Sequence, residues 1–297
     1  MDKVNRIDIT GEIRQEYNKL LIETLTFVLD FFKRHKLHYV ACGGTVLGAV
    51  RHRGLIPWDD DIDLYMPRKD YERLLSLNNE LNKGGYEVVS HLNNGYYLPF
   101  AKISNIKTTI WEMQELPFVY GVFVDIFPLD YFDCSDEEIV QIQDKSISLF
   151  SKYVNALSVY RIKDFIASVL SSNKSKSTKI LASFLVAPFK TRRHKTFINF
   201  ISKYTKGIGE KCVCITQWKG KIFKSIWFED TIEVPFENTS IIIPREYDAY
   251  LKLLYGDYMT PPPLEERESH HNLFYLNLKE RKTIKEILSL KKNKYEC

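Results

Sequence analysis

Apolar residues near the start of the chain recur at the spacing of a helix that buries one face. The repeat runs from about residue 9 to residue 36 and consists of Leu20, Leu21, Leu25, Val28, Leu29 and Phe32. Intervals of three and four residues place these side chains on one side of a helix, with Phe27 and Phe31 at its margin. The pattern therefore predicts a long opening helix packed on a hydrophobic core.

Strand-like and helix-like patterns alternate from there to about residue 129, and a helical, lysine-rich stretch follows to about residue 209. Short strand-like runs return at 213–216, 222–227 and 241–243, before a helix over 244–255 and an amphipathic helix over 280–291. This order predicts an α+β fold, in which a mixed β-sheet core is flanked by helices. A helical insertion and a C-terminal helical part complete the expected architecture.

An acidic segment in the first third of the chain has the alternation of a half-buried strand. Polar and apolar residues alternate over residues 61–66, until Pro67 ends the run. Side chains two apart on a strand share a face and lie about 7 Å apart at Cα. Asp61 and Asp63 can therefore converge on a cation between them.

Four carboxylates within positions 59–63 are unfavourable without a counter-ion. Two carboxylates about 4 Å apart repel by about 4 kcal/mol at an effective dielectric of about 20. Oxygen ligands without a nearby His or Cys favour magnesium (Mg²⁺) or manganese (Mn²⁺) over zinc. Asp59 and Asp60 lie off the shared strand face, and we expect them to shape the loop. A solvated acidic turn is the alternative, which Trp58 and the apolar alternation disfavour.

A glycine turn and a basic short helix precede the acidic run. Residues 39–42 form a short apolar strand, which meets Gly43 and Gly44 before a helical stretch that begins at Thr45. Glycines let the backbone bend tightly and bring amide groups close to an anion, and the helix start adds a favourable dipole. Arg51 adds positive charge suited to a negatively charged substrate. An ordinary turn followed by surface arginines is the alternative.

The apolar run 122–127 is typical of a buried central strand, and it contains Asp125. An ionised aspartate there costs several kcal/mol unless it is paired or coordinates a metal. The alternative role for Asp125 is to cap a turn before Pro128. Asp130 lies beyond that proline, and we expect it to serve structure.

Lys102 lies in a second strand-like run, residues 97–103. From an adjacent strand its ammonium could point at the same cleft as Asp125. A solvated charge at a strand edge is the alternative reading.

Three blocks of the chain resemble the LicD family of the nucleotidyltransferase superfamily. The first is 43–64, where Gly-Gly-Thr is followed at a fixed distance by Asp-apolar-Asp. The second is 121–130, and the third is 255–263 together with His270 and His271. The resemblance covers about 35–135 and 244–275. The family includes bacterial phosphocholine transferases and, more distantly, fukutin-type sugar phosphotransferases.

The resemblance implies a nucleotidyltransferase-like sheet in which Asp61, Asp63 and Asp125 hold one or two magnesium ions. It implies a donor site formed by Gly43, Gly44, Thr45 and Arg51, with Lys102 as a further candidate, and it makes His270 and His271 candidates for acid–base catalysis. On this basis we divide the chain into a nucleotidyltransferase-like catalytic core (1–135), a helical basic insertion (136–210) and a C-terminal part completing the active site (211–297).

The activity implied is transfer of phosphocholine, or a similar phospho-alcohol, from a CDP-activated, CDP-choline-like donor to a sugar hydroxyl. The acceptor would be a cell-surface glycan precursor or lipid-linked oligosaccharide, and CMP would be released. Two alternatives stay open at this point. The same metal core could serve a nucleotidyltransferase that acts on an NTP and releases pyrophosphate, or the chain could be a non-catalytic binding protein of the same fold.

Composition narrows the setting of this activity. The five cysteines are odd in number and scattered, which favours a reducing compartment. The N-terminus lacks an apolar signal core, and the longest apolar segment, 180–189, contains Pro188 and is too short to span a bilayer. We therefore expect a cytoplasmic protein. A net charge of +4 without a recognition motif argues against nucleic-acid binding.

The positive charge is concentrated in the insertion. Residues 161–195 carry nine Lys or Arg and one acid, Asp164, interleaved with the apolar segment 180–189. Basic residues beside an apolar face are typical of a helix that lies in a membrane interface. We hypothesise a peripheral contact with the inner face of a bacterial membrane. The alternative is a solvated helical insertion whose apolar stripe packs on the core.

Overall fold

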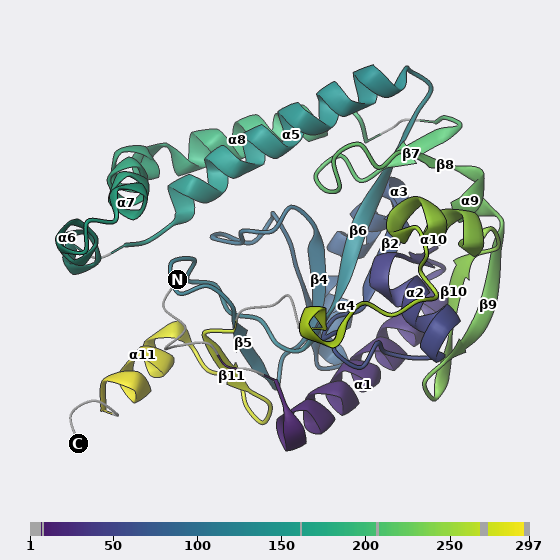
Figure 1. Cartoon of the computed structure of the whole chain (residues 1–297), viewed down its shortest axis with the longest axis horizontal. Helices are drawn as coiled ribbons and strands as arrows, with labels where there is room; N and C mark the ends of the chain where they lie inside the picture. Colours follow the sequence, from purple (N-terminus) through teal and green to yellow (C-terminus); the bar gives the residue numbers. More distant parts are fainter. Residues whose placement is uncertain (1–6, 8, 161, 206–207, 268–272, 294–297) are drawn as a thin grey trace.

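A computed structural model of the chain describes residues 7, 9–160, 162–205, 208–267 and 273–293 (Figure 1). Its central sheet has the strand order β1-β2-β6-β4-β3, and β7 and β8 extend it beside the C-terminal end of β6. β2 and β6 run parallel, and the other paired strands of the sheet are antiparallel. The sheet strands are β1 (Val40–Ala41), β2 (Asp63–Pro67), β3 (Tyr86–Val89), β4 (Ala101–Asn105), β6 (Phe123–Phe132), β7 (Lys211–Val213) and β8 (Phe223–Lys224). The predicted α+β class with a mixed sheet is confirmed.

Two small antiparallel pairs lie outside this sheet. They are β9 (Thr231–Phe236) with β10 (Thr239–Pro244), and β5 (Thr109–Trp111) with β11 (Tyr275–Asn277). The second pair joins residues more than 160 positions apart, so the C-terminal part of the chain packs back on its first half.

Helices surround the sheet, and the opening helix lies across it. The α-helices are α1 (Gly11–His35), α2 (Gly43–His52), α3 (Arg68–Ser76), α4 (Asn78–Lys83), α5 (Asp136–Leu157), α6 (Ile162–Leu170), α7 (Lys174–Val186), α8 (Lys190–Ile201), α9 (Ile226–Glu229), α10 (Tyr247–Tyr255) and α11 (Ile284–Asn293). Helix α1 contacts β6 and β4, and it ends where Lys36 takes a left-handed conformation. Its predicted extent is confirmed. Its buried face is confirmed in part, because Phe31, predicted at the margin, is buried, whereas Leu20 and Leu29 are half-buried.

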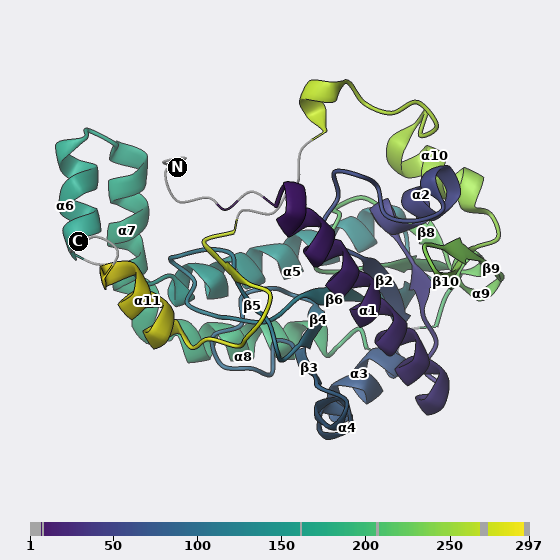
Figure 2. The same cartoon turned by 90° about the horizontal axis from the view of Figure 1, so that it is seen from below.

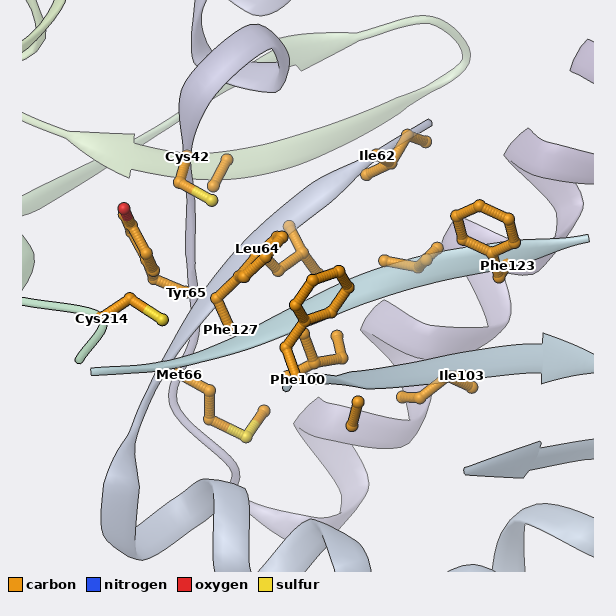
Figure 3. Packing of buried hydrophobic residues seen from close by; sticks show 14 of the residues in the cluster. Cys42, Ile62, Leu64, Tyr65, Met66, Phe100, Ile103, Phe123, Phe127 and Cys214 are labelled. Atoms are coloured by element: carbon orange, nitrogen blue, oxygen red, sulfur yellow. The ribbon is translucent and has the colours of Figure 1, made fainter. Parts of the chain in front are cut away.

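The core lies where β2, β6 and β4 meet (Figure 3). Ile62 and Leu64 are fully buried, as their positions in the alternating run predicted. The rings of Phe100 and Phe127 lie 4.2 Å apart between their centroids. Leu64 lies on the face of β2 opposite Asp63, whereas Phe127, two residues after Asp125, lies on the same face of β6 as Asp125. Apolar packing on both faces therefore fixes β2 against β6 and sets the positions of the two aspartates.

The insertion is helical, as predicted. α5 begins with a capping box, in which the Ser135 hydroxyl accepts from the Glu138 amide and the Glu138 carboxylate accepts from the Ser135 amide. α5 and α8 run side by side, and α6 and α7 form a hairpin at one end of the molecule (Figures 1 and 2). Within the described parts of the chain, no helix is both long enough and apolar enough to cross a membrane.

Some predicted boundaries differ from the structure. β2 begins at Asp63 rather than Asp61. The run 222–227 contains only the short β8 before the chain turns into α9. Pro244 ends β10 instead of opening a helix, because that strand pairs on one side with β9 and tolerates a residue without an N–H group there. Helix α10 accordingly begins later than predicted, at Tyr247, and α11 also begins later, at Ile284.

Candidate metal and phosphate site

Three aspartates meet where β2 and β6 lie side by side. The parallel register sets Asp63 directly opposite Asp125, and the Asp125 amide donates to the carbonyl oxygen of Ile62 at 2.8 Å. Carboxylate oxygens of Asp61, Asp63 and Asp125 all lie within 4.8 Å of one another. Asp61 precedes β2, so the loop before the strand, rather than the strand pleat, brings its carboxylate to this point.

A second acidic group adjoins the first through Asp61. Carboxylate oxygens of Asp59, Asp60 and Asp61 also lie within 4.8 Å of one another. Helix α1 holds this loop, because the Tyr17 hydroxyl donates to the Asp60 carbonyl at 2.9 Å and the Arg14 guanidinium donates to the Asp59 carbonyl at 2.7 Å. Asp59 and Asp60 thus belong to an anchored loop, and their side chains add to the same concentration of negative charge.

Burial and like charge make full ionisation of these groups unfavourable. Burial, followed by the neighbouring Asp61, raises the pKa of Asp59 to about 8. Burial, with Asp61 and Asp125 nearby, raises the pKa of Asp63 well above its usual range, although the Lys102 ammonium opposes the rise. A bound divalent cation would remove this repulsion.

The donor set fits a hard cation. Among the described residues, both groups of candidate ligands consist of aspartates, with no His or Cys in either. All-oxygen carboxylate sites suit magnesium or manganese rather than zinc. The residues present therefore fit the ion that the sequence predicts, and its binding stays a prediction.

Lys102 reaches the same place from β4. It is paired in register with Asp125, and its ammonium lies 2.7 Å from one Asp125 carboxylate oxygen and 3.0 Å from the other. The side chains of Lys102 and Asp125 are only 1% and 3% exposed. The ammonium also lies 3.3 Å from the centroid of the Phe123 ring. Lys102 is therefore not a solvated edge charge, and its contact is with Asp125.

The first turn of α2 closes over the acidic group. Gly43 has φ of +52°, and a Cβ on it would lie 3.4 Å from an Asp63 carboxylate oxygen. A Cβ on Gly44 would lie 2.8 Å from a carboxylate oxygen of Asp59. The two glycines therefore let the start of α2 approach the carboxylates closely.

Two groups assigned to donor binding make internal hydrogen bonds. The Thr45 hydroxyl accepts from the Asp63 amide at 2.8 Å, and the Gly43 amide donates to the Tyr250 hydroxyl at 2.9 Å. These bonds fix α2 to β2 and to α10, which lies beside it (Figure 1). Contact of Gly43, Gly44 and Thr45 with a diphosphate stays a prediction.

Positive charge gathers on one side of the acidic loop. The Arg51 guanidinium carbon lies 6.0 Å from the centroid of a Trp58 ring, and that of Arg267 lies 4.9 Å from it. Arg51 is held by a 2.7 Å hydrogen bond to the Tyr258 carbonyl. Burial, followed by repulsion from Arg267, lowers the pKa of Arg51. Two guanidinium groups around one indole form a place suited to a phosphate anion.

Sequence reasoning missed Arg267, Tyr250 and Tyr255. Tyr255 lies beside Gly43, and burial together with the charge of Asp63 raises its pKa above the usual range. The only signal for these residues was their position in or next to the third resembling block. His270 and His271, the pair assigned to that block, lie outside the described residues.

Comparison with known proteins relates the chain to a known family. Residues 36–169 match the domain described as LicD/FKTN/FKRP, nucleotidyltransferase domain. The chain is 28% identical over 251 residues to the lipopolysaccharide cholinephosphotransferase LicD of Haemophilus influenzae, a match covering 82% of this chain and 92% of that protein. Shorter matches are to uncharacterised proteins of Rickettsia prowazekii (30% identical over 87 residues, 29% of this chain and 31% of that protein) and Rickettsia typhi (29% over 103 residues, 35% and 32%).

These matches define the protein as an enzyme of the transferase class. The segment that matches the LicD-family domain, residues 36–169, contains the three metal-ligand candidates. The family resemblance predicted from the sequence is thereby confirmed.

Proposed function

We propose that the protein transfers phosphocholine, or a similar phospho-alcohol, from a CDP-activated donor to a sugar hydroxyl of a cell-surface glycan precursor. The observation that carries the proposal is the convergence of Asp61, Asp63 and Asp125 within 4.8 Å, where two neighbouring strands and the loop before β2 meet in the part of the chain that matches the LicD domain. The similarity to a lipopolysaccharide cholinephosphotransferase over most of both chains supports the choice of substrate class.

The three carboxylates would hold magnesium, or manganese, on the nucleotidyltransferase-like sheet. When bound, the ion would neutralise the diphosphate of the donor and make the acceptor hydroxyl more acidic. Lys102 would hold Asp125 in place through its ion pair, because a buried carboxylate without that cation would rotate or take up a proton. Arg51 and Arg267, whose guanidinium groups lie beside Trp58, would bind the phosphates of the donor.

The reaction forms one bond and breaks one. The acceptor oxygen bonds to the phosphorus that carries choline, and the bond from that phosphorus to the bridging oxygen breaks, so that CMP leaves with this oxygen. The hydroxyl proton passes to a base, a role that we assign to His270 or His271. Positioning and charge neutralisation supply most of the rate enhancement in such transfers.

A donor panel tests this proposal. The purified protein is incubated with magnesium and CDP-choline, CDP-ethanolamine, CDP-glycerol or CDP-ribitol, with and without a glycan acceptor. We expect CMP from one donor, dependent on the acceptor and abolished by EDTA. CMP release from none of these donors would contradict the proposal.

Pyrophosphate release from an NTP is the second candidate activity. The description of the matching domain as a nucleotidyltransferase domain favours including it. The two activities differ in the phosphorus attacked, so the products separate them. NTPs in the same panel would yield pyrophosphate if this alternative holds, and a binding protein of the same fold would yield neither product.

A further inference from the structure

The α6–α7 hairpin packs in the reverse of the usual order. The one buried residue of α6, over residues 162–170, is Ser168, and α7 buries Ile180 and Ser183. The hydroxyls of Ser168 and Ser177 lie 2.8 Å apart between the helices. Surface helices of globular proteins normally bury their large apolar residues and expose the small polar ones. Here serine hydroxyls lie between the two helices, and most of the large apolar residues of the hairpin are exposed, although Ile180 is buried.

We call the exposed large apolar side chains of residues 159–189 the hairpin face. Nine of the 20 large apolar side chains exposed among the described residues belong to it: Val159, Ile162, Ile166, Val169, Leu170, Leu181, Phe184, Leu185 and Phe189. Leu170 is 81% exposed and Leu185 is 68% exposed. So many exposed apolar side chains in one segment mark an interaction surface. The sequence-based alternative, in which this stripe packs on the protein, holds only in part: Ile180 is buried and α7 contacts α5, whereas Leu181 and Leu185 are exposed.

The charge around the hairpin face selects the partner. Residues 161–195 carry nine basic residues and one acid, a net +8 in a chain of net +4. Lys174, Lys176 and Lys179 are exposed on α7 itself. A symmetric contact with a second copy would bring two such segments together, and their charges would repel. A lipid bilayer with anionic headgroups offers negative charge at its surface and apolar chains beneath it.

The length and placement of the hairpin fit a surface contact. With 9 and 13 residues, α6 and α7 are shorter than the about 20 residues needed to span a bilayer. The hairpin projects on the same side of the molecule as the segment between α10 and η3 (Leu264–Glu266) (Figure 2). That segment exposes Met259, η3 exposes Leu264, and Tyr255 at the end of α10 lies beside Gly43. A flat membrane resting on the hairpin would thus lie on the side of the site.

We propose that the α6–α7 hairpin docks the protein on an anionic lipid bilayer through the hairpin face and its flanking lysines. The contact is peripheral, with the apolar side chains entering the headgroup region. It is independent of the proposed transfer reaction, because binding to lipid requires neither donor nor acceptor.

Vesicle flotation of the full chain tests the proposal, with vesicles of phosphatidylcholine alone or mixed with phosphatidylglycerol. We expect binding to the mixed vesicles that weakens with salt, and little binding to phosphatidylcholine alone. Leu185→Ser should weaken binding about tenfold or more, as should Ile166→Ser. Lys176→Gln and Lys179→Gln should each weaken it about fivefold.

Matched controls lie at the opposite end of the molecule. Ile226, on α9, is 55% exposed against 51% for Ile166, so Ile226→Ser should leave binding unchanged. Lys224→Gln is the corresponding control for charge, because Lys224 is also exposed. Absence of binding to mixed vesicles, or equal losses in the hairpin and control variants, overturns the proposal.

Sedimentation velocity of the same variants tests whether a second copy of the chain, rather than lipid, covers the hairpin face. A dimer that dissociates on Leu185→Ser, without vesicle binding by the parent protein, would assign the hairpin face to a second copy and overturn lipid docking. CMP release with a water-soluble acceptor should be unchanged in every hairpin variant, so failure of the donor panel and failure of lipid docking remain distinguishable.

Discussion

Strand β6 carries a buried aspartate near each end, and the two are paired in different ways. Asp130 accepts two hydrogen bonds of 2.8 Å from the Arg68 guanidinium, one to each carboxylate oxygen. Asp125 accepts two from the Lys102 ammonium. At first sight both ends are buried ion pairs of the same kind.

The surroundings of the two aspartates differ. Asp125 shares its place with Asp61 and Asp63, whereas the carboxylate of Asp130 belongs to neither group of candidate metal ligands in the described chain. A bidentate arginine balances one carboxylate, and such a pair serves structure. Several carboxylates around one ammonium leave negative charge that a cation can balance. The surplus of like charge, rather than burial alone, therefore distinguishes a metal site from a structural pair.

Asp63→Asn tests the acidic end and carries the largest expected effect. Turnover should fall by about 10³-fold or more, because the transition-state charge loses its counter-ion. The fold should be retained and the metal-free protein should be no less stable, since one repelling carboxylate is gone. Product formation and thermal unfolding measure the two effects. Asp230→Asn, at an exposed aspartate paired with Arg245, is the matched control and should change neither. Turnover of Asp63→Asn within tenfold of the parent would remove Asp63 from the metal site.

Asp130→Asn tests the structural end. It leaves Arg68, only 5% exposed, without its bidentate partner, so that its remaining charged contact is with the Glu72 carboxylate at 3.5 Å. We expect the free energy of unfolding to fall by about 3 kcal/mol, while turnover per folded molecule stays unchanged. Urea denaturation measures the loss. The double variant Arg68→Met/Asp130→Leu removes both charges and should recover much of it. A large loss of turnover in folded Asp130→Asn would instead make the two ends alike.

The sequence predicted more of the elements than of the contacts between them. Local periodicity placed α1, the insertion helices and the buried strand that carries Asp125, because apolar spacing reports which face of an element is buried. It also assigned Asp130 to structure, since that residue follows a proline beyond the apolar run. Periodicity could not distinguish the two-residue β8 from the α9 that follows it, because so short a run has no distinctive period.

Contacts between distant residues could not be predicted in this way. The ion pair of Lys102 with Asp125 depends on the register of β4 against β6, which neither segment specifies alone. The hydrogen bond from Gly43 to Tyr250 joins residues 207 apart, and it redirects an amide that the glycine pattern assigned to an anion. Tertiary packing determines both contacts.

Lys102→Met sharpens the difference between the ends through metal dependence. Without magnesium the variant should lose about 1–3 kcal/mol of stability, because the buried Asp125 carboxylate loses its ammonium partner. Magnesium should restore much of this loss, since the ion can take over charge balance at that carboxylate. Arg68→Met should lose stability that magnesium does not restore. Thermal unfolding with and without magnesium measures both, and equal magnesium responses in the two variants would contradict a metal site confined to the Asp125 end.

Lowering the pH should change the stability of the protein in opposite directions at the two ends of β6. At the acidic end, the folded-state pKa of about 8 for Asp59 lies above its unfolded value, so stability there rises as the pH falls below 8. Near Arg68, burial and then the guanidinium charge lower the pKa of His91 to about 4. The unfolded chain then binds more protons at this histidine between about pH 6.5 and 4, and its contribution to stability is lost as the pH falls through that range.

His91→Gln isolates the smaller of these effects. Subtracting the variant's free energy of unfolding from that of the parent at each pH cancels the Asp59 contribution, because distant sites act additively. The difference should decline by about 1 kcal/mol between pH 7 and 5.5, the window in which a histidine with a pKa of about 4 stays neutral only in the folded chain. Urea denaturation across this range measures it. A difference independent of pH would mean that His91 accepts its proton in the folded protein, and acid sensitivity would then not separate the two ends of β6.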